Sequence, residues 1–270
     1  MKILILLLLW AGLLLGPNNN PGKEEFFLVT YKIDLKPFKS KYTKVTETAR
    51  LYISDEKSIF LDEKLDKHLK LERESPSPAE RESRIMEIGP PRFSYIIIKD
   101  LARQKYNRIE EHFTKEYIGY EAPGFDKNSW HILPDTSTIS NLLTYKATCQ
   151  YGGRNWNAWF TTEIPISDGP YKFSGLPGLI LKLESEDGDY TFSIVGMQKV
   201  SLFPHIPDFK TVSSEKYEEL ISLSSNPILK MESNGIKLGT MKMNGKVVTR
   251  EELILSVNKD LADKNHIEKQ

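Results

Sequence analysis

Two glycine-containing turns constrain this chain more than any other feature, because each joins two segments in which apolar and polar residues alternate. Residues 145–151 read YKATCQY and residues 156–160 read WNAWF, with Gly152-Gly153 between them. A second pair, 179–184 and 190–195, is joined through Asp187-Gly188. Such turns between alternating segments are strong signals of β-hairpins. The sequence therefore predicts two antiparallel hairpins in its second half.

Further strands are expected before these hairpins. Short runs rich in aromatic and β-branched residues, which favour strands, are separated by turn-like residues. These runs are residues 25–35, 46–53, 57–61, 93–99, 105–110, 115–120 and 130–133. Their spacing is typical of an antiparallel meander.

The last part of the chain is expected to be helical. Residues 214–223 follow a serine and place apolar side chains at helical spacing. Residues 249–261 begin with Thr-Arg-Glu-Glu, the pattern of a capping box. The charged residues 263–270 are expected to fray.

These elements predict a mainly β fold: a large, twisted antiparallel sheet or half-barrel with C-terminal helices packed on it. Residues 23–270 are expected to form a single β-rich domain with a charged insertion near residues 62–88. Leu65 and Leu69 indicate a short amphipathic helix in this insertion. Its prolines predict that Ser75–Glu87 forms a disordered loop.

The first 22 residues have the pattern of a signal peptide followed by a linker. Lys2 precedes the apolar run Ile3–Leu15, which is about 13 residues long, whereas a helix that spans a bilayer needs about 20. No cysteine follows the run, so lipoprotein processing there is not expected. The sequence predicts Sec-type export, no stable membrane span after signal removal, and a periplasmic or secreted location.

Charge and cysteine content narrow the possible partners. The chain has 37 basic and 37 acidic residues, so its formal net charge is zero. Nucleic-acid binding needs clustered basic charge, and no nucleic-acid partner is expected. Cys149 is the single cysteine, which excludes an internal disulfide. It is expected to be a small buried side chain on a strand.

The sequence lacks the motifs of several enzyme classes. The five histidines do not have the spacing of a metal site, and there is no GxSxG, P-loop or GxGxxG motif. No metal or cofactor is therefore expected. Glu163 and Asp168 flank a long loop and could form the acid pair of a glycoside hydrolase. The sequence nevertheless favours binding over catalysis.

The loop Pro165–Gly178 is longer than most connections, and its rings and prolines predict an ordered structure. Leu176-Pro177-Gly178-Leu179 predicts a type II turn. Residue types that dominate binding hot spots gather in this loop and the preceding hairpin. The candidate binding residues are Arg154, Trp156, Trp159, Glu163, Tyr171 and Phe173. Alternatively, the tryptophans pack on opposite faces of the sheet, and Arg154 and Glu163 form internal salt bridges.

Residues 175–180 spell GLPGLI, and the surrounding residues resemble the GLPGLI family as well. The shared positions are Ala147, Gly153-Arg154, Ala158–Thr161, Ile164-Pro165 and Gly169-Pro170. The resemblance is specific over about forty residues, from Tyr145 to Glu184. It implies an exported bacterial protein, often encoded beside outer-membrane TonB-dependent transport genes, in a family without established catalytic residues.

Three functions follow as hypotheses. The first is an envelope binding or accessory protein associated with an outer-membrane transport system, with a TonB-dependent transporter or another envelope protein as partner. The second is a carrier that holds a lipid or hydrophobic peptide in a concave apolar pocket. The third is a hydrolase that uses Glu163 and Asp168.

Overall fold

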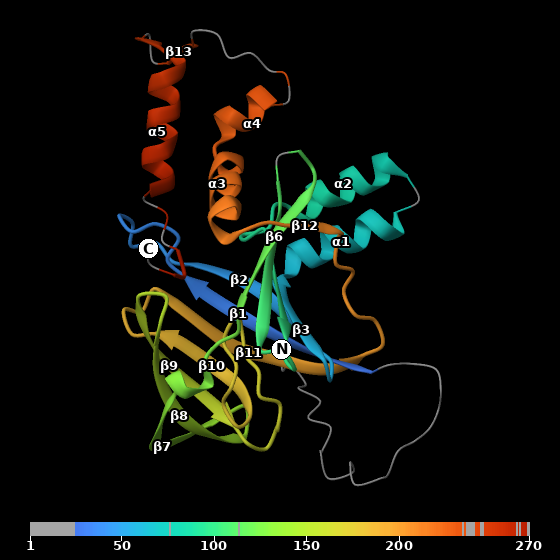
Figure 1. The fold of residues 1–270 in the computed structure, drawn as a ribbon, viewed down its shortest axis with the longest axis vertical. Coiled ribbons are helices and arrows are strands. Elements are labelled where there is room, and N and C mark those ends of the chain that lie inside the picture. The colour runs from blue at the N-terminus through green and yellow to red at the C-terminus, as the bar shows by residue number, and fades with distance from the viewer. Residues whose placement is uncertain are drawn as a thin grey trace, which may run out of the picture.

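A twelve-stranded sheet dominates the described part of the chain (Figure 1). The computed structural model describes residues 25–75, 77–112, 114–233, 235, 241–243, 246–262, 264 and 266–268. The predicted signal peptide and linker therefore lie outside the described residues. None of the helices in the described part combines the length and apolar character required for a membrane crossing.

Eleven of the twelve strands of the sheet overlap the predicted runs and hairpins, whereas Phe209–Thr211 was not predicted as a strand. The twelve strands are β1 Phe26–Leu35, β2 Val45–Ile53, β3 Lys57–Asp62, β4 Tyr95–Asp100, β5 Lys105–Glu111, β6 Tyr117–Pro123, β7 His131–Ile139, β8 Leu142–Tyr151, β9 Arg154–Thr161, β10 Leu179–Ser185, β11 Tyr190–Val200 and β12 Phe209–Thr211. A separate hairpin pairs β13 Met241–Met243 with β14 Lys246–Val248. The five α-helices of the described part are α1 Glu63–Glu74, α2 Pro78–Ile88, α3 Ser214–Ser225, α4 Pro227–Ser233 and α5 Arg250–Ala262.

The sheet is open, with strand order β12-β6-β5-β4-β3-β2-β1-β11-β10-β9-β8-β7. Its neighbours pair antiparallel except for β12 and β6, which are parallel, so the sheet is mixed rather than purely antiparallel. Both predicted hairpins are confirmed, β8–β9 through Gly152-Gly153 and β10–β11 through Asp187-Gly188. The mainly β fold with packed helices is therefore confirmed.

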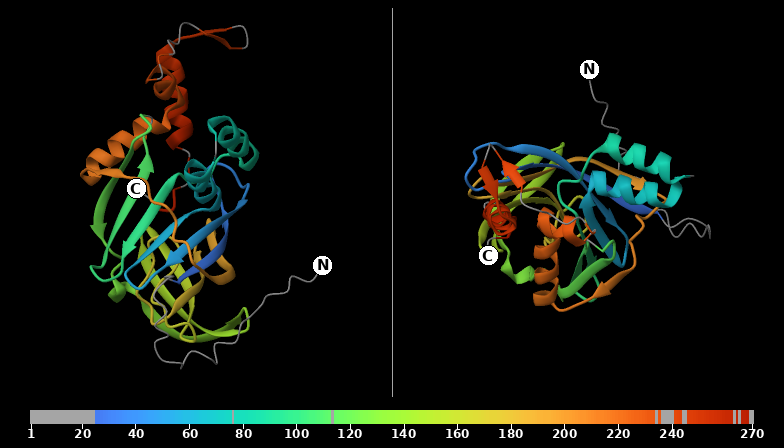
Figure 2. Two further views of the ribbon diagram at one scale, coloured as in Figure 1. Left: turned by 90° about the vertical axis from the view of Figure 1, so that its right-hand side faces the viewer. Right: turned by 90° about the horizontal axis from the view of Figure 1, so that it is seen from above.

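The sheet buries apolar side chains on both faces, because successive residues of a strand point to opposite sides. On β3, Phe60 belongs to one buried cluster, whereas Ile59 and Leu61 belong to another. We call the face of Phe60 the inner face, since its cluster collects residues from β1 to β6 and from β8 to β11. We call β1 to β6 one wing of the sheet and β8 to β11 the other. The two wings therefore curve around the inner face (Figure 2).

The charged insertion covers the outer face. Asp62 caps α1 by accepting the N–H of Lys64 at 2.7 Å, and Leu65 and Leu69 then pack with Ile59. The predicted amphipathic helix is confirmed. It provides the apolar cover that the outer face of β2 and β3 needs.

The prediction of a disordered loop over Ser75–Glu87 was wrong, because α2 occupies most of this segment. Ser77 is the N-cap and accepts the N–H of Glu80 at 3.2 Å. Pro78 occupies the first turn, where its missing N–H costs no helical hydrogen bond. The Ser-Pro pair therefore starts a helix instead of breaking one.

Two of the three C-terminal helices, α3 and α5, follow the sequence signals, whereas α4 was not predicted. Tyr217 of α3 packs against Tyr120 of β6 with ring centroids 4.8 Å apart, which confirms a helix on the sheet. The capping box of α5 is reciprocal: the Thr249 hydroxyl accepts the Glu252 N–H at 3.2 Å, and the Glu252 carboxylate accepts the Thr249 N–H at 2.9 Å. Beyond α3, α4 packs against α3 and α5 against α4.

Candidate functional site

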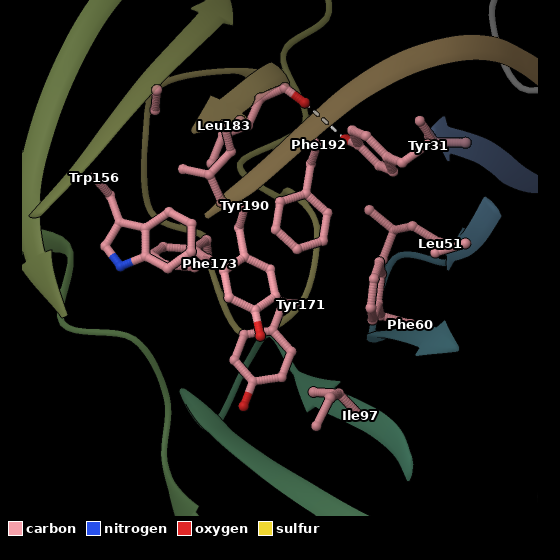
Figure 3. Packing of buried hydrophobic residues seen from close by; sticks show 14 of the residues in the cluster. Tyr31, Leu51, Phe60, Ile97, Trp156, Tyr171, Phe173, Leu183, Tyr190 and Phe192 are labelled. Atoms are coloured by element: carbon pink, nitrogen blue, oxygen red, sulfur yellow. Dashed lines mark hydrogen bonds between the residues drawn. The ribbon is translucent and has the colours of Figure 1, made fainter. Parts of the chain in front are cut away.

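The loop Pro165–Gly178, which we call the core loop, fills the inner face. Phe173 packs against Trp156 of β9 with ring centroids 4.9 Å apart, and Tyr171 reaches the ring of Phe60 at 6.5 Å. Figure 3 shows both side chains between residues of the two wings. The expectation of an ordered loop is confirmed, and its rings are part of the hydrophobic core.

A buried ion pair fixes the start of the core loop. The ammonium of Lys99, on the inner face of β4, pairs with the carboxylate of Asp168 and donates to the carbonyl of Gly169 at 2.7 Å. The same carboxylate accepts the Gly169 N–H at 2.7 Å. Burial lowers the pKa of Lys99, and the neighbouring Asp168 opposes that shift. This pair holds the core loop on the inner face of the sheet.

The end of the core loop differs from the predicted type II turn. The Gly178 N–H donates to the carbonyl of Leu176 at 2.8 Å, which closes a tighter, three-residue turn. Glycine is required here by close approach, because a Cβ at position 178 would lie 1.9 Å from the carbonyl oxygen of Thr161. The GLPGLI sequence therefore brings the loop backbone directly against the end of β9.

A second buried ammonium lies in the middle of the core loop. Lys172 places its Nζ 4.6 Å from the ring centre of Tyr106 and 5.2 Å from that of Tyr171. Aromatic faces attract cations at such distances. Its ionic partner is Glu268, whose carboxylate lies 2.6 Å away.

The Glu268 carboxylate also binds tyrosine hydroxyls. It accepts the hydroxyl of Tyr171 at 2.7 Å and that of Tyr151 at 3.3 Å. Burial opposes the ionisation of Glu268, but Lys172, Tyr171 and the nearby Arg108 outweigh it and hold the pKa of Glu268 below its usual value. Burial raises the pKa of Tyr171 well above its usual value, so this hydroxyl stays protonated and donates. Lys172, Tyr171 and Tyr151 therefore together hold the ionised carboxylate of Glu268.

Arg154 holds the backbone that leads to Glu268. Its Nη2 donates to the carbonyl of His266 at 2.9 Å and its Nε to that of Ile267 at 3.1 Å. Its Nη1 pairs with Asp187 and with Asp189, the latter at 3.0 Å. One planar guanidinium thus joins the β10–β11 turn to two consecutive carbonyls.

We call His266–Glu268 the tail segment. Residues 263–270 were predicted to fray, but 264 and 266–268 make defined contacts, and 263, 265, 269 and 270 lie outside the described residues. Ile267 packs against the inner cluster, and Lys264 forms a bridge with Phe38. Glu268 lies on the β8–β9 turn, where a Cβ at Gly152 would be 2.6 Å from its Cγ. The tail segment is held by partners far away in sequence, so its own charged composition did not reveal the contact.

The structure brings together four of the six predicted binding residues. Arg154, Trp156, Tyr171 and Phe173 are buried around the inner face. Trp156 is therefore a core residue, as the packing alternative expected, and Arg154 forms the internal salt bridges that were the other alternative.

The other two predicted binding residues lie elsewhere. Trp159 is half-buried on the opposite face of β9, with Lys146 5.9 Å from its ring centre. Glu163 is exposed and accepts the N–H of Leu143 at 2.8 Å. Because Asp168 is buried and paired with Lys99, an exposed acid pair with Glu163 does not form.

Sequence reasoning missed Lys172, Tyr151 and Glu268. The signal for Lys172 was available, because a lysine between Tyr171 and Phe173 in an apolar motif must find a partner when the motif is buried. Cys149 is buried as expected, and burial raises the pKa of its thiol to about 12, which leaves it unreactive.

A polar hollow of about 270 Å³ lies between β5 and α3. Glu110, His112 and Lys264 contribute to its wall. Glu110 also accepts the hydroxyl of Tyr217 at 3.1 Å. Within the described residues, no three His, Cys, Asp or Glu side chains gather as metal ligands.

The fold is similar to solved structures of PNGF-II. One, in a P21 space group, has a TM-score of 0.56 and 13% identity, and the match covers 74% of this chain and 34% of that chain. Another, in a C2 space group, has a TM-score of 0.54 and 12% identity. That match covers 74% of this chain and 33% of the other. This chain thus spans about a third of the length of those chains. At this identity the likeness shows the fold alone.

No curated protein matches the chain. Residues 152–182 match the model of a family described as "Protein of unknown function (Porph_ging)". The matched segment begins at the β8–β9 turn and includes Arg154, Tyr171 and Lys172. The matched segment therefore supplies Tyr171 and Lys172 of the cluster, whereas Tyr151 and Glu268 lie outside it.

Proposed function

We propose that this protein is an exported envelope binding protein of the GLPGLI family that holds an anionic group on its inner face. The observation that carries the proposal is the buried ammonium of Lys172 with a carboxylate at 2.6 Å. A buried charge is costly without a partner, so a fold that keeps an ammonium at this position has a use for an anion there. Export and association with an outer-membrane transport system rest on the signal-like N-terminus and the family resemblance.

The chemistry of the cluster supports binding rather than catalysis. Lys172, Tyr171 and Tyr151 all donate to a single carboxylate oxygen. Burial raises the pKa of both tyrosines, so their hydroxyls keep their protons. Charge-assisted hydrogen bonds of this kind recognise an anion without transferring a proton to it.

The alternatives gain less support. A carrier needs a concave apolar pocket, whereas the rings of Phe173 and Trp156 fill the space between the wings. A hydrolase needs two accessible carboxylates, whereas Asp168 is buried against Lys99. We therefore retain the envelope binding role with an anionic ligand as the single proposal.

The test compares what the chain from residue 23 onward retains from an envelope extract with what the Lys172→Met variant retains. Mass spectrometry should find anionic compounds that the wild-type protein retains and the variant does not. Lys182→Met is the matched control, because Lys182 forms a partly exposed pair with Glu184. Equal retention by Lys172→Met, or retention of neutral lipid alone, would contradict the proposal. Tyr171→Phe serves as a milder variant if Lys172→Met does not fold.

A further inference from the structure

We infer that the tail segment occupies a peptide-binding groove, and that a peptide with an apolar residue followed by an acidic residue displaces it. The inference rests on the proposed function and names its ligand class. The tail segment supplies three kinds of contact at once: backbone carbonyls, an apolar side chain and a carboxylate. Each meets a group that the sheet or the core loop holds in place.

The backbone contact is independent of the ligand's side chains. Arg154 donates to the carbonyls of His266 and Ile267 at 2.9 and 3.1 Å. These are main-chain groups that every peptide has, so any extended segment in this position would offer the same two acceptors. Asp187 and Asp189 orient the guanidinium from the β10–β11 turn, and these two contacts do not involve the tail segment.

Two side-chain positions give the groove its selectivity. Ile267 packs against the inner cluster and fixes one position as apolar. The next position is acidic, because Lys172 and Tyr171 donate to the Glu268 carboxylate at 2.6 and 2.7 Å. A neutral side chain there would leave the ammonium of Lys172 buried without its counter-charge.

The floor of the groove is main chain. Glu268 passes over Gly152, where a Cβ would lie 2.6 Å from the Glu268 Cγ and 3.1 Å from its Cα. A side chain at this position would collide with the acidic side chain of a bound peptide and crowd its backbone. The close approach means that a peptide fits here only over a bare turn.

The tail segment can be exchanged for a peptide because Arg154 and Lys172, which bind it, are also held by other residues. Arg154 is anchored by two aspartates, and Lys172 by the rings of Tyr106 and Tyr171. The tail segment is the part of this contact that arrives from beyond α5 rather than from the sheet or the core loop. A tethered segment competes with a free peptide at an effective concentration on the order of 1 mM. A peptide of sufficient affinity or abundance therefore replaces it.

The experiment uses the chain from residue 23 onward with a labelled peptide, KNHIEKQ, which copies residues 264–270. Fluorescence anisotropy compares the wild-type chain with Glu268→Ala, in which the carboxylate position is vacated. Glu268→Ala should bind the peptide roughly tenfold or more tightly than wild type, because the tethered competitor is weakened. The peptide KNHIQKQ should bind Glu268→Ala roughly tenfold more weakly than KNHIEKQ, because it lacks the charge.

Two controls locate the binding. Glu219→Ala removes an exposed carboxylate of α3 that pairs with Lys216, and it should behave as wild type. Lys172→Met combined with Glu268→Ala should lose the preference for KNHIEKQ over KNHIQKQ. Circular dichroism verifies that each variant is folded, and Tyr171→Phe replaces Lys172→Met if that variant is not.

The outcomes separate the inference from the proposed function. Equal affinity of wild type and Glu268→Ala for KNHIEKQ overturns the inference, since the tail segment then does not compete. The proposed function survives that result if anionic compounds from the extract still require Lys172. Absence of peptide binding at about 1 mM, the effective concentration of a short tether, likewise overturns the inference alone. Binding that Lys172→Met leaves unchanged, for both the peptide and the extract compounds, overturns both.

Discussion

Two buried lysine–carboxylate pairs hold the same core loop, yet they differ in how their carboxylates arrive. Lys99 and Asp168 come from β4 and from the loop itself, and their side chains are 5% and 0% exposed. Lys172 is just as buried, at 1%, but its partner Glu268 is 34% exposed and comes from the tail segment. The first pair is closed from every side, whereas the second is open on the side of its acid.

The difference teaches that burial of the cation alone does not define the role of an ion pair. When both partners are fixed on strands or on a packed loop, neither charged group can leave the other. Such a pair acts as a structural clamp. When one partner lies on a separate segment at the surface, its place can be taken by another carboxylate. The same two chemical groups therefore serve as a clamp at Asp168 and, in the function that we propose, as a binding site at Lys172.

The largest effect is expected from Asp168→Ala. It leaves the ammonium of Lys99 buried without its counter-charge, and the free energy of unfolding should fall by about 3–5 kcal/mol. Urea denaturation measures this loss. Glu184→Ala, which breaks the partly exposed pair with Lys182, should cost less than about 1 kcal/mol. If Asp168→Ala lowered the free energy of unfolding no more than Glu184→Ala, the Lys99–Asp168 pair would not be a structural clamp.

Lys172→Met should cost less, about 1–3 kcal/mol, because the partly exposed Glu268 carboxylate can turn to water once its partner is gone. The same urea titration compares it directly with Asp168→Ala. If Lys172→Met proved the more destabilising of the two, Glu268 would be as firmly fixed as Asp168. The two pairs would then belong to one class.

Tyr171→Phe should lower the free energy of unfolding by about 0.5–1.5 kcal/mol, since it removes one hydrogen bond to Glu268 and keeps the packed ring. Thermal unfolding of the variant and of Tyr95→Phe provides the comparison. The ring of Tyr95 lies 5.7 Å from that of Tyr171. A loss of several kcal/mol for Tyr171→Phe would mean that the hydroxyl, rather than the ring, organises the loop.

The smallest effect concerns pH. The pKa of Glu268 is lowered in the folded protein, so its contribution to stability is present above its unfolded value, about 4.3, and is lost as pH falls through the lower folded value. The difference in unfolding free energy between wild type and Glu268→Ala should therefore be constant from neutral pH down to about 5 and shrink below about 4. Using the difference cancels the titration of His266, whose pKa burial lowers. A change centred near neutral pH would assign the contact to a histidine instead.

Local signals predicted most of the fold. The glycine turns placed both hairpins, and the Thr249 capping box placed α5, because each signal acts between residues that are close in sequence. Ser77-Pro78 was misread, since the same pair that ends a helix also starts one. The parallel pairing of β12 with β6 has no local signal, because about ninety residues separate the two strands.

The site was only half predictable for the same reason. Arg154 and Tyr171 stood out by residue type, but nothing in their neighbourhood points to Glu268, which is 97 residues beyond Tyr171. Trp159 lies on the opposite face of β9 from Arg154, and Glu163 follows the end of that strand, so residue type alone assigned both to the wrong group. The tail segment is polar by composition, and polar composition predicts exposure unless a buried cation lies within reach.

The bare turn at Gly152 carries a consequence for how such sequences vary. Gly152 and Gly153 both have positive φ, at 57° and 68°, and Asn-Gly is a favoured sequence for a turn of this kind. Asparagine would therefore suit the backbone at position 152, but its Cβ would collide with the Glu268 side chain. A homologous chain with Asn-Gly at this turn is expected to have lost the acidic residue of its tail. The turn and the tail should covary, although more than a hundred residues lie between them.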